Sequence, residues 1–234
     1  MSRFDHRSTQ KELMDDLDCS GEELAQTLSE LKTINRWLGG NYVTLRGLEE
    51  LVAHFPQQSY TVADIGCGGG DMVRIMSAWA EKQQVPVSFI GIDANPNIIE
   101  LAKVRQGDLR SVRWSVQNVF DSDFEQEQVD IVTCTLFTHH FTDSELVGLF
   151  CRMQRKARLG IVINDLHRHP LAFHSIRLLT SLFSRSPMVK NDASLSVLRS
   201  FSKKDWRNIL FQAGITHSHI RWFWAFRWLV LIKF

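Results

Sequence analysis

The chain has 234 residues, of which 44% are hydrophobic and 23% are charged, a composition that excludes a disordered or fibrous protein. This length can bury a full hydrophobic core, so we expect one domain with an appendage. No apolar run is long enough to span a bilayer, and we expect no transmembrane segment. The N-terminus lacks an apolar signal segment and no cysteines form a C-x-x-C motif, so a cytoplasmic location is expected. The cysteines are Cys19, Cys67, Cys134 and Cys151.

The net charge of +1 conceals an uneven distribution along the chain. Residues 61–150 carry 6 basic and 13 acidic side chains, whereas residues 151–234 carry 15 basic and 3 acidic ones. Two interpretations stay open. Either the acidic and basic parts of one domain face each other or are simply solvated, or the last third presents a basic face to an anionic substrate, a nucleic acid or an anionic lipid.

The first 60 residues predict a helical lead-in. Residues 1–20 are polar and acidic and hold no pattern long enough for a stable helix, so we expect them to fray or to dock. Apolar residues then recur every three or four positions from Gly21 to Leu38 and again from Tyr42 to Phe55. This is the pattern of two amphipathic helices.

From Thr61 onward, short apolar runs alternate with amphipathic segments, which is the signature of a parallel sheet with helices between its strands. Five strands are expected before an apolar, helix-patterned insertion over residues 170–200, and a hairpin is expected at the end. The expected strands are residues 61–65, 87–92, 112–116, 129–135 and 159–163, and the hairpin covers roughly residues 216–224 and 227–234.

A glycine-rich turn follows the first of these strands, in the segment V-A-D-I-G-C-G-G-G-D from Val62 to Asp71. Glycine takes positive φ freely and lets a ligand lie against bare backbone, so this cluster indicates a ligand-binding turn. A dinucleotide site needs G-x-G-x-x-G, whereas this turn has the spacing D-x-G-x-G-x-G. Asp71 also stands where a pyrophosphate would bind, and like charges repel there. A cationic ligand without phosphates fits the turn better.

This D-x-G-x-G-x-G turn resembles motif I of the class I S-adenosylmethionine-dependent methyltransferases of the small-molecule type. The segment G-I-D-A-N-P, residues 91–96, resembles the acidic loop of the same family. The resemblance covers residues 61–234 and implies S-adenosyl-L-methionine as cofactor and S-adenosyl-L-homocysteine as product. The cofactor-binding residues that it implies are Asp64, Gly66, Cys67, Gly68, Gly70, Asp93, Ala94, Asn118, Val119 and Thr135.

Two of these positions allow a second interpretation. Asp93 ends the second predicted strand, where a carboxylate can accept hydrogen bonds from both ribose hydroxyls of an adenosine; alternatively, it only caps the helix beginning at Pro96. Asn118 stands where the family usually has an acidic residue that accepts from the adenine amino group. Its amide oxygen can accept the same hydrogen bond, or it is a surface turn residue.

Polar loops follow the fourth and fifth predicted strands. Ligands of open α/β sheets bind at the carboxyl ends of the strands, so both loops should border cofactor and acceptor. The first contains His139 and His140 and resembles the region after motif IV of the family, where one such histidine positions the loop. In the second, we predict that Asp165 orients His167 as a general base, with loop-capping hydrogen bonds as the alternative. We expect no metal, because a closed zinc site needs four ligands at recurring spacing.

The resemblance implies a Rossmann-like doubly wound α/β sheet of about seven strands with the last strand antiparallel. We divide the chain into a helical N-terminal cap, residues 1–60, and a methyltransferase domain, residues 61–234. Within it, residues 170–200 are the predicted substrate lid, whose Met, Phe and Leu content favours an apolar or aromatic acceptor. In this family N-terminal helices cover the cofactor. The resemblance therefore implies three further candidate site residues, namely Asn35, Arg36 and Tyr42. Ordinary packing is the alternative interpretation of these three.

The predicted reaction is in-line displacement at the sulfonium methyl, which needs alignment and exclusion of water. A phenolic acceptor has an ordinary pKa of about 10, so a histidine base would assist its deprotonation. We therefore predict O-methylation of a small aromatic or polyketide-like acceptor in secondary metabolism. The catalytic candidates are His140, His167 and His139.

Three alternatives stay open, and the oligomeric state is not predicted. A methyltransferase of RNA or protein would use the basic last third, so nucleic acid is kept as an alternative to the expected small-molecule partner. A nicotinamide oxidoreductase and a non-enzymatic cofactor-binding protein are the other two. The aromatic residues of the final hairpin are expected to pack on helices, with a membrane-surface role as their alternative.

Overall fold

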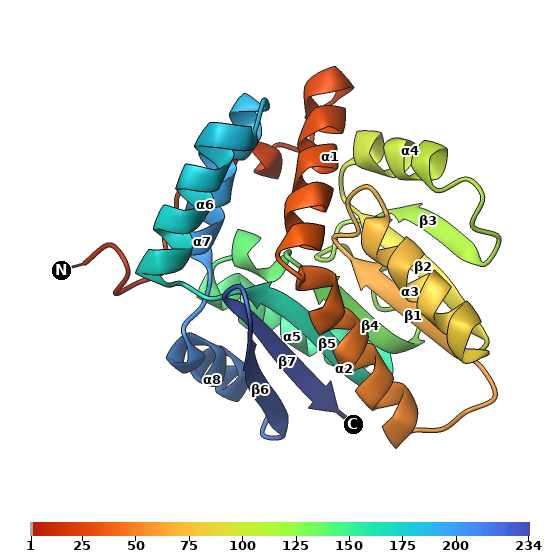
Figure 1. Cartoon of the computed structure of the whole chain (residues 1–234). Helices are drawn as coiled ribbons and strands as arrows, with labels where there is room; N and C mark the ends of the chain where they lie inside the picture. The colour runs from red at the N-terminus through yellow and green to blue at the C-terminus, as the bar shows by residue number, and fades with distance from the viewer. Residues whose placement is uncertain (1) are drawn as a thin grey trace.

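A seven-stranded mixed sheet with helices on both faces forms the centre of the computed structural model, which describes residues 2–234 (Figure 1). The strand order is β3-β2-β1-β4-β5-β7-β6, in which β1 to β5 run parallel and β7 is antiparallel to both β5 and β6. The predicted Rossmann-like α/β fold with an antiparallel last strand is confirmed. The strands are β1 Tyr60–Ile65, β2 Val87–Asp93, β3 Val112–Val116, β4 Val129–Thr135, β5 Ala157–Leu166, β6 Ser218–Phe223 and β7 Arg227–Lys233.

The N-terminal part contains a 3-10 turn, η1 (Leu13–Asp15), and the two expected helices, α1 (Gly21–Trp37) and α2 (Gly40–His54). Gly39 separates the helices with a φ of 68°, a left-handed conformation that favours glycine. Of the two expectations for residues 1–20, docking is the one observed around η1. The carboxylate of Asp192 accepts hydrogen bonds from the Leu13 and Met14 backbone N–H groups at 2.9 and 3.0 Å.

The core lies on both faces of the sheet because side chains alternate along each strand. In β7, Val230 and Ile232 join the cluster that α5 and α8 cover, whereas Leu229 and Leu231 join the cluster that α2 and α3 cover. The helices after the first strand are α3 Asp71–Gln83, α4 Pro96–Arg105, α5 Asp143–Lys156, α6 Pro170–Phe183, α7 Pro187–Arg199 and α8 Lys203–Gln212, and a second 3-10 turn, η2, covers Thr138–His140.

The insertion after β5 folds into helices α6 and α7, which stand beside α1 at the upper left of Figure 1. Glu30 of α1 joins them, because its Oε1 accepts from the backbone N–H groups of Arg185 and Ser186 at 3.0 and 3.2 Å. Helix α6 leaves apolar side chains exposed, namely Leu171, Leu178, Leu182 and Phe183.

Many basic residues of the last third pair with acidic residues of earlier segments. Arg158 lies 2.8 Å from Asp130, and both Arg221 and Lys233 pair with Glu50 at 2.5 and 3.3 Å. These contacts favour acidic and basic parts that face each other.

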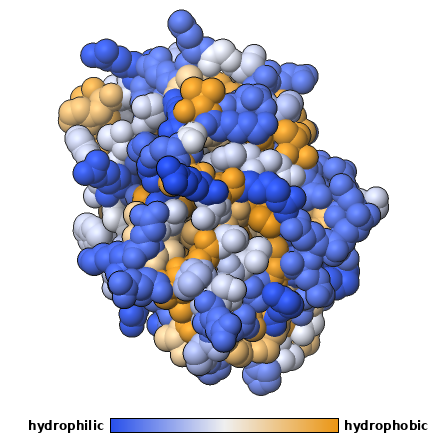
Figure 2. All heavy atoms as spheres, turned by 90° about the vertical axis from the view of Figure 1, so that its right-hand side faces the viewer, coloured by the Kyte–Doolittle hydropathy of each residue, from blue (hydrophilic) through white to orange (hydrophobic). Residues whose placement is uncertain are grey.

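Figure 2 shows a largely hydrophilic face on which apolar side chains gather around a hollow. Within residues 2–234, no helix combines the length and apolar character needed to cross a bilayer.

Candidate functional site

The glycine-rich turn lies between β1 and α3 at the carboxyl edge of the sheet. Gly66, Gly68 and Gly70 have φ values of 66°, 52° and 76°, which residues with a side chain rarely adopt. A Cβ on Gly66 would lie 2.1 Å from Cδ2 of Phe137, and a Cβ on Gly70 would lie 2.4 Å from Cη2 of Trp114. Backbone conformation and close packing therefore both require glycine, and Phe137 brings the loop after β4 against this turn.

Asp71 begins α3, and its Oδ1 lies 2.7 Å from Nζ of Lys32 on α1. This pairing offsets the carboxylate charge, so the repulsion of a pyrophosphate is weaker than the sequence suggested. The choice of cofactor consequently depends less on Asp71 than on the glycine turn and the acidic loop after β2.

Asp93 connects that acidic loop to the glycine turn. Its Oδ2 accepts from the Gly68 N–H and its Oδ1 from the Asn95 N–H, each at 3.1 Å. Burial raises the pKa of Asp93, and these N–H groups together with the charge of nearby His140 oppose the rise. The cap of α4 is Asn95, whose Oδ1 accepts from the Asn97 N–H at 2.8 Å, so the helix-cap interpretation of Asp93 is wrong. Carboxylate oxygens that each accept one N–H can still accept a ribose hydroxyl.

Asp64 and Cys67 support the turn from inside. The hydroxyl of Thr133 in β4 donates to Asp64 Oδ1 at 2.7 Å, and burial raises the pKa of Asp64 to about 7. The Cys67 N–H donates to the carbonyl of Ile92 in β2 at 3.0 Å. Burial also raises the pKa of the Cys67 thiol well above its ordinary value, which makes the thiol unreactive. Ala94, between Asp93 and Asn95, is half-buried.

Three other predicted cofactor residues already have contacts within the protein. The amide oxygen of Asn118 accepts from the Phe120 N–H at 3.0 Å, as in a surface turn. The same oxygen has a second lone pair that can accept from adenine, so the adenine contact stays a prediction. Val119 places its side chain in the core with 5% exposed. The hydroxyls of Thr135 and Thr44 lie 2.8 Å apart and join β4 to α2.

The two histidines of η2 have different surroundings. His139 is buried, with Nδ1 2.7 Å from Asp165 Oδ1 and Nε2 3.7 Å from Glu12 Oε1. Asp165 also accepts from the Thr138 hydroxyl and the His139 N–H, at 2.6 and 3.1 Å. Burial would raise the pKa of Asp165, but the charge and hydrogen bond of His139 hold it at about 2. Acidic groups thus face both ring nitrogens of His139, an arrangement that positions the loop.

His140 is half-buried, and its Nδ1 lies 2.5 Å from Oδ1 of Asp15 in η1. Burial opposes ionisation of Asp15, but the hydrogen bond and charge of His140, together with Arg199, bring the pKa of Asp15 to about 2. An ionised Asp15 only accepts, so the proton of a neutral His140 lies on Nδ1 and Nε2 is left as a base. No side chain of residues 2–234 forms a hydrogen bond with that Nε2.

The structure does not pair Asp165 with His167, so that part of the prediction is wrong. His167 instead packs against aromatic rings, with its ring centre 4.9 Å from that of Trp228, and its Nδ1 has no hydrogen-bond partner within residues 2–234. Burial, together with the charges of His169 and Arg168, lowers the pKa of His167 to about 4. A base with that pKa is largely neutral near pH 7 but weakly basic.

Sequence reasoning missed Glu12, Asp15 and Arg199, which surround the histidine loop. Arg199 Nη1 donates to Asp15 Oδ2 at 2.7 Å, and Arg199 Nε donates to the His139 carbonyl at 3.1 Å. Burial raises the pKa of Glu12 to about 7. The acidic composition of the N-terminal segment signals Glu12 and Asp15, and the basic composition of the last third signals Arg199, but neither composition indicates a partner.

Comparison with known proteins agrees with this geometry. A family model described as "Methyltransferase domain" matches residues 62–160. Ubiquinone biosynthesis O-methyltransferase of Xanthomonas axonopodis pv. citri is 27% identical over 128 residues, which cover 54% of this chain and 51% of that protein. An uncharacterized methyltransferase of Bacillus subtilis, YcgJ, is 28% identical over 86 residues, 36% of this chain and 32% of its own. The chain therefore spans about half or less of the curated relatives that it matches.

Solved structures share the fold at low identity. The plantazolicin methyltransferase BpumL in complex with SAH superposes with a TM-score of 0.63 at 15% identity, covering 90% of this chain and 94% of that one. Human N-acetylserotonin methyltransferase in complex with SAM gives a TM-score of 0.61 at 13% identity, covering 91% and 56%. These structures show that the fold is shared, and the resemblance inferred from the glycine turn and the acidic loop agrees with the family model that matches residues 62–160.

Proposed function

We propose that this chain is a class I S-adenosylmethionine-dependent methyltransferase that methylates a hydroxyl group of a small aromatic or polyketide-like acceptor. The match of residues 62–160 to a methyltransferase family model supports the first part of this proposal. The observation that carries this proposal is the neighbourhood of Asp93 and His140. The Asp93 carboxylate accepts from the Gly68 N–H at 3.1 Å, and Phe137, three residues before His140, packs against the same glycine turn at Gly66.

The cofactor lies along the carboxyl edge of β1, β2 and β4 in this proposal. The glycine turn contacts its methionine part, Asp93 accepts from its ribose hydroxyls, and Asn118 with Val119 borders its adenine. Ala94, Thr135 and the buried Asp64 complete the surroundings. When bound, the cofactor supplies the electrophilic methyl group.

His140 acts on the acceptor. Asp15 holds its ring with Nδ1 protonated, and Nε2 takes the proton of the acceptor hydroxyl as the oxygen forms its bond to the methyl carbon. Positive charge is lost from the sulfonium during transfer, so the remaining requirements are alignment and exclusion of water. Helices α1, α6 and α7 supply that exclusion, with residues 170–200 as the lid and residues 1–60 as the cap.

The experiment is incubation of the purified protein with methyl-labelled S-adenosylmethionine and an extract of the source cells, followed by separation into organic-soluble, nucleic-acid and protein fractions. Label in the organic phase supports the proposal and provides a product for mass spectrometry. Label in RNA or protein would instead assign the basic last third to a macromolecular substrate. Tighter binding of NADH than of S-adenosylhomocysteine would contradict the proposal, and so would full cofactor affinity without transfer to any fraction.

A further inference from the structure

Three arginines are buried, namely Arg168, Arg199 and Arg227, and Arg7 is half-buried; Arg227 differs from the other three. Arg7, Arg168 and Arg199 each bond carboxylates and backbone carbonyls; Arg168, for example, lies 2.9 Å from Asp205 and donates to the carbonyls of Phe4 and Ser200. Arg227 has only 2% of its surface exposed and donates one hydrogen bond, from Nη2 to Asn35 Oδ1 at 2.9 Å. Its Nε and Nη1 have no partner within residues 2–234.

A buried cation without a paired anion is expensive, because its lost hydration is not replaced. Burial lowers the pKa of Arg227 to about 10, and the charge of Asp165 opposes this shift only in part. The guanidinium therefore still carries its charge at pH 7. Proteins retain such groups chiefly where a function requires them.

A chain of polar contacts runs from Thr135, beside the proposed cofactor, to Gly40, and Arg227 lies next to its end. Thr135, at the end of β4, contacts Thr44 of α2. Asn164 of β5 then donates from Nδ2 to the Thr44 hydroxyl at 3.0 Å and to the Gly40 carbonyl at 2.8 Å. A Cβ on Gly40 would lie 3.0 Å from Nη2 of Arg227. The amide oxygen of Asn164 is also buried, and among residues 2–234 it has no hydrogen-bond partner. An unpaired acceptor and unpaired donors therefore occur along one edge of the sheet.

The turn that carries Arg227 is strained. Ala225 and Phe226, between β6 and β7, have φ values of 60° and 57°, which are uncommon for residues other than glycine, asparagine and aspartate. Such strain persists where the surroundings hold it, and it is often found at functional sites. Here it positions Arg227 at the first residue of β7, beside α1 and α2.

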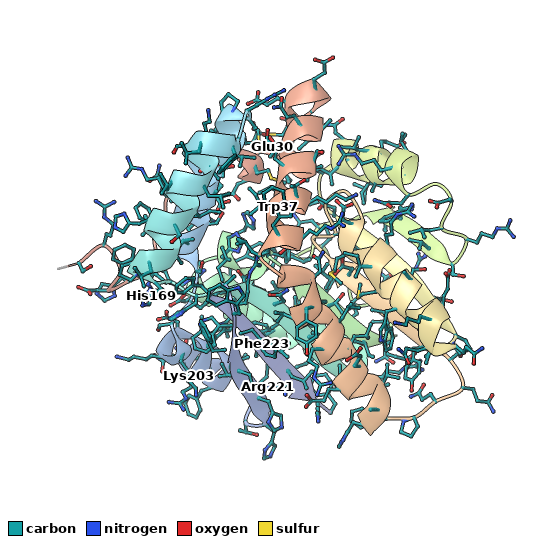
Figure 3. The ribbon with its side chains drawn as sticks, viewed as in Figure 1. Glu30, Trp37, His169, Lys203, Arg221 and Phe223 are labelled. Carbon is teal, nitrogen blue, oxygen red and sulfur yellow. The ribbon has the colours of Figure 1, made fainter. Side chains whose placement is uncertain are left out.

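The strand neighbours of Arg227 are apolar or aromatic residues. Phe223 of β6 pairs directly with Arg227, and Leu166 of β5 pairs with it on the other side. The ring centre of Tyr42 lies 6.2 Å from that of Phe223. Figure 3 shows Phe223 below Trp37, in the region between α1 and the final hairpin. Trp37 is 74% exposed and Tyr42 59% exposed, so both can change position as a ligand enters.

We propose that Arg227 is the anion-recognition group of the acceptor site, and that the acceptor is an aromatic compound bearing a carboxylate. This inference rests on the proposed function and names its substrate class. A carboxylate supplies both the missing charge and acceptors for the unpaired N–H groups, and such charge-assisted hydrogen bonds are strong. The aromatic ring packs against Phe223 and Tyr42, while Asn164 accepts from a hydroxyl of the same ligand.

The first test measures binding to the S-adenosylhomocysteine complex by calorimetry. The probes are benzoate, 4-hydroxybenzoate and 2-naphthoate, each compared with its neutral amide. At least one carboxylate should bind the wild type more tightly than its amide by roughly 10- to 100-fold, the range for one charge-assisted hydrogen bond. Arg227→Gln should abolish that preference, and Arg227→Lys should restore it in part. Arg221→Gln on the neighbouring strand removes the same charge and should change nothing.

Two results would overturn the inference: no carboxylate preference in the wild type, or a preference that survives Arg227→Gln. Because S-adenosylhomocysteine binding is measured in the same samples, the two proposals fail separately. Loss of its binding in the wild type counts against the proposed function, whereas intact cofactor binding without carboxylate preference counts against Arg227 alone.

A second test needs no ligand. If Arg227 is kept for recognition, its unpaired charge lowers stability, and Arg227→Met should leave the melting temperature unchanged or raise it. Arg168→Met, which removes a buried guanidinium with all its partners, should lower the melting temperature clearly. A comparable fall in both variants would make Arg227 a structural residue and overturn the inference.

Discussion

Nδ1 of His140 lies 2.5 Å from Oδ1 of Asp15, although the two residues are 125 positions apart in the chain. Asp15 is held in turn by Arg199 of α7, at 2.7 Å. The N-terminal segment thus supplies the carboxylate that orients a histidine at the end of β4. The contacts of Asp15 that dock η1 therefore also orient the candidate base.

His140→Gln tests the base assignment. Removal of a general base costs about 10²- to 10⁴-fold in turnover, so we expect a fall in kcat within that range with unchanged affinity for S-adenosylhomocysteine. The measurement is label transfer at saturating cofactor, with calorimetry for binding. His217→Gln, at an exposed position between α8 and β6, is the control. Unchanged turnover in His140→Gln would remove His140 from the mechanism.

Asp15→Asn tests the orientation of that base. The amide keeps the size of the side chain but removes the negative charge that fixes the proton on Nδ1 of His140. We expect a smaller loss of turnover than in His140→Gln, with normal cofactor affinity. Asp18→Asn, close in sequence but exposed, should behave as the wild type. Wild-type turnover in Asp15→Asn would show that the contact is only structural.

Asp93→Asn should weaken cofactor binding. The substitution removes charge from hydrogen bonds to the glycine turn and to the proposed ribose hydroxyls, and a charge-assisted hydrogen bond contributes about 1.5 to 3 kcal/mol. We expect the Kd for S-adenosylhomocysteine to rise by about 10- to 100-fold. Asp108→Asn changes an exposed carboxylate paired with Arg74 and should leave the Kd unaltered. Equal Kd values would refute the ribose contact.

Gly66→Ala should destabilise the protein more than Gly214→Ala does. Both glycines have left-handed φ, 66° and 72°, and a left-handed conformation costs a residue with a side chain about 1 to 2 kcal/mol. Only at Gly66 does the added Cβ also meet Phe137, whereas nothing lies within 4 Å at Gly214. Overpacking adds about 1 to 3 kcal/mol. Urea unfolding that gave both variants the same loss would contradict this packing.

Glu12→Gln should change how stability depends on pH. The folded pKa of Glu12 is about 7, above its ordinary 4.5, so the folded state binds this proton more tightly than the unfolded state. Its contribution to stability is therefore full below pH 4.5 and is lost as the pH rises through 7. Glutamine does not titrate, so the variant should gain about 3 kcal/mol relative to the wild type between pH 4.5 and pH 8.

Urea unfolding across that pH range provides the measurement for Glu12→Gln, with the exposed Glu22→Gln on α1 as its control. Asp64, whose folded pKa is also raised to about 7, titrates in every variant, so some pH dependence persists. Parallel stability curves for the wild type and Glu12→Gln would show that Glu12 is not destabilised by burial.

The sequence by itself determined the features that depend on neighbouring residues in the chain. Alternating apolar runs predicted the strands and helices, because burial of one face imposes a period of two or of 3.6. The glycine turn and Asp93 were identified because backbone conformation and strand-end chemistry are local properties. Even here, only the structure excluded the helix-cap role of Asp93, since Asn95 is the residue that caps α4.

Only the tertiary structure decided which charged groups meet. Asp165 is two residues from His167 in sequence, yet it bonds His139, because the ends of β4 and β5 lie side by side and spacing along one strand says nothing about its neighbour. The same holds for Asp15 with His140 and for Arg227, whose unpaired nitrogens follow from how β7 packs beneath α1 and α2. Local patterns encode elements, whereas the partners of a buried charge are set by the packing of segments far apart in the chain.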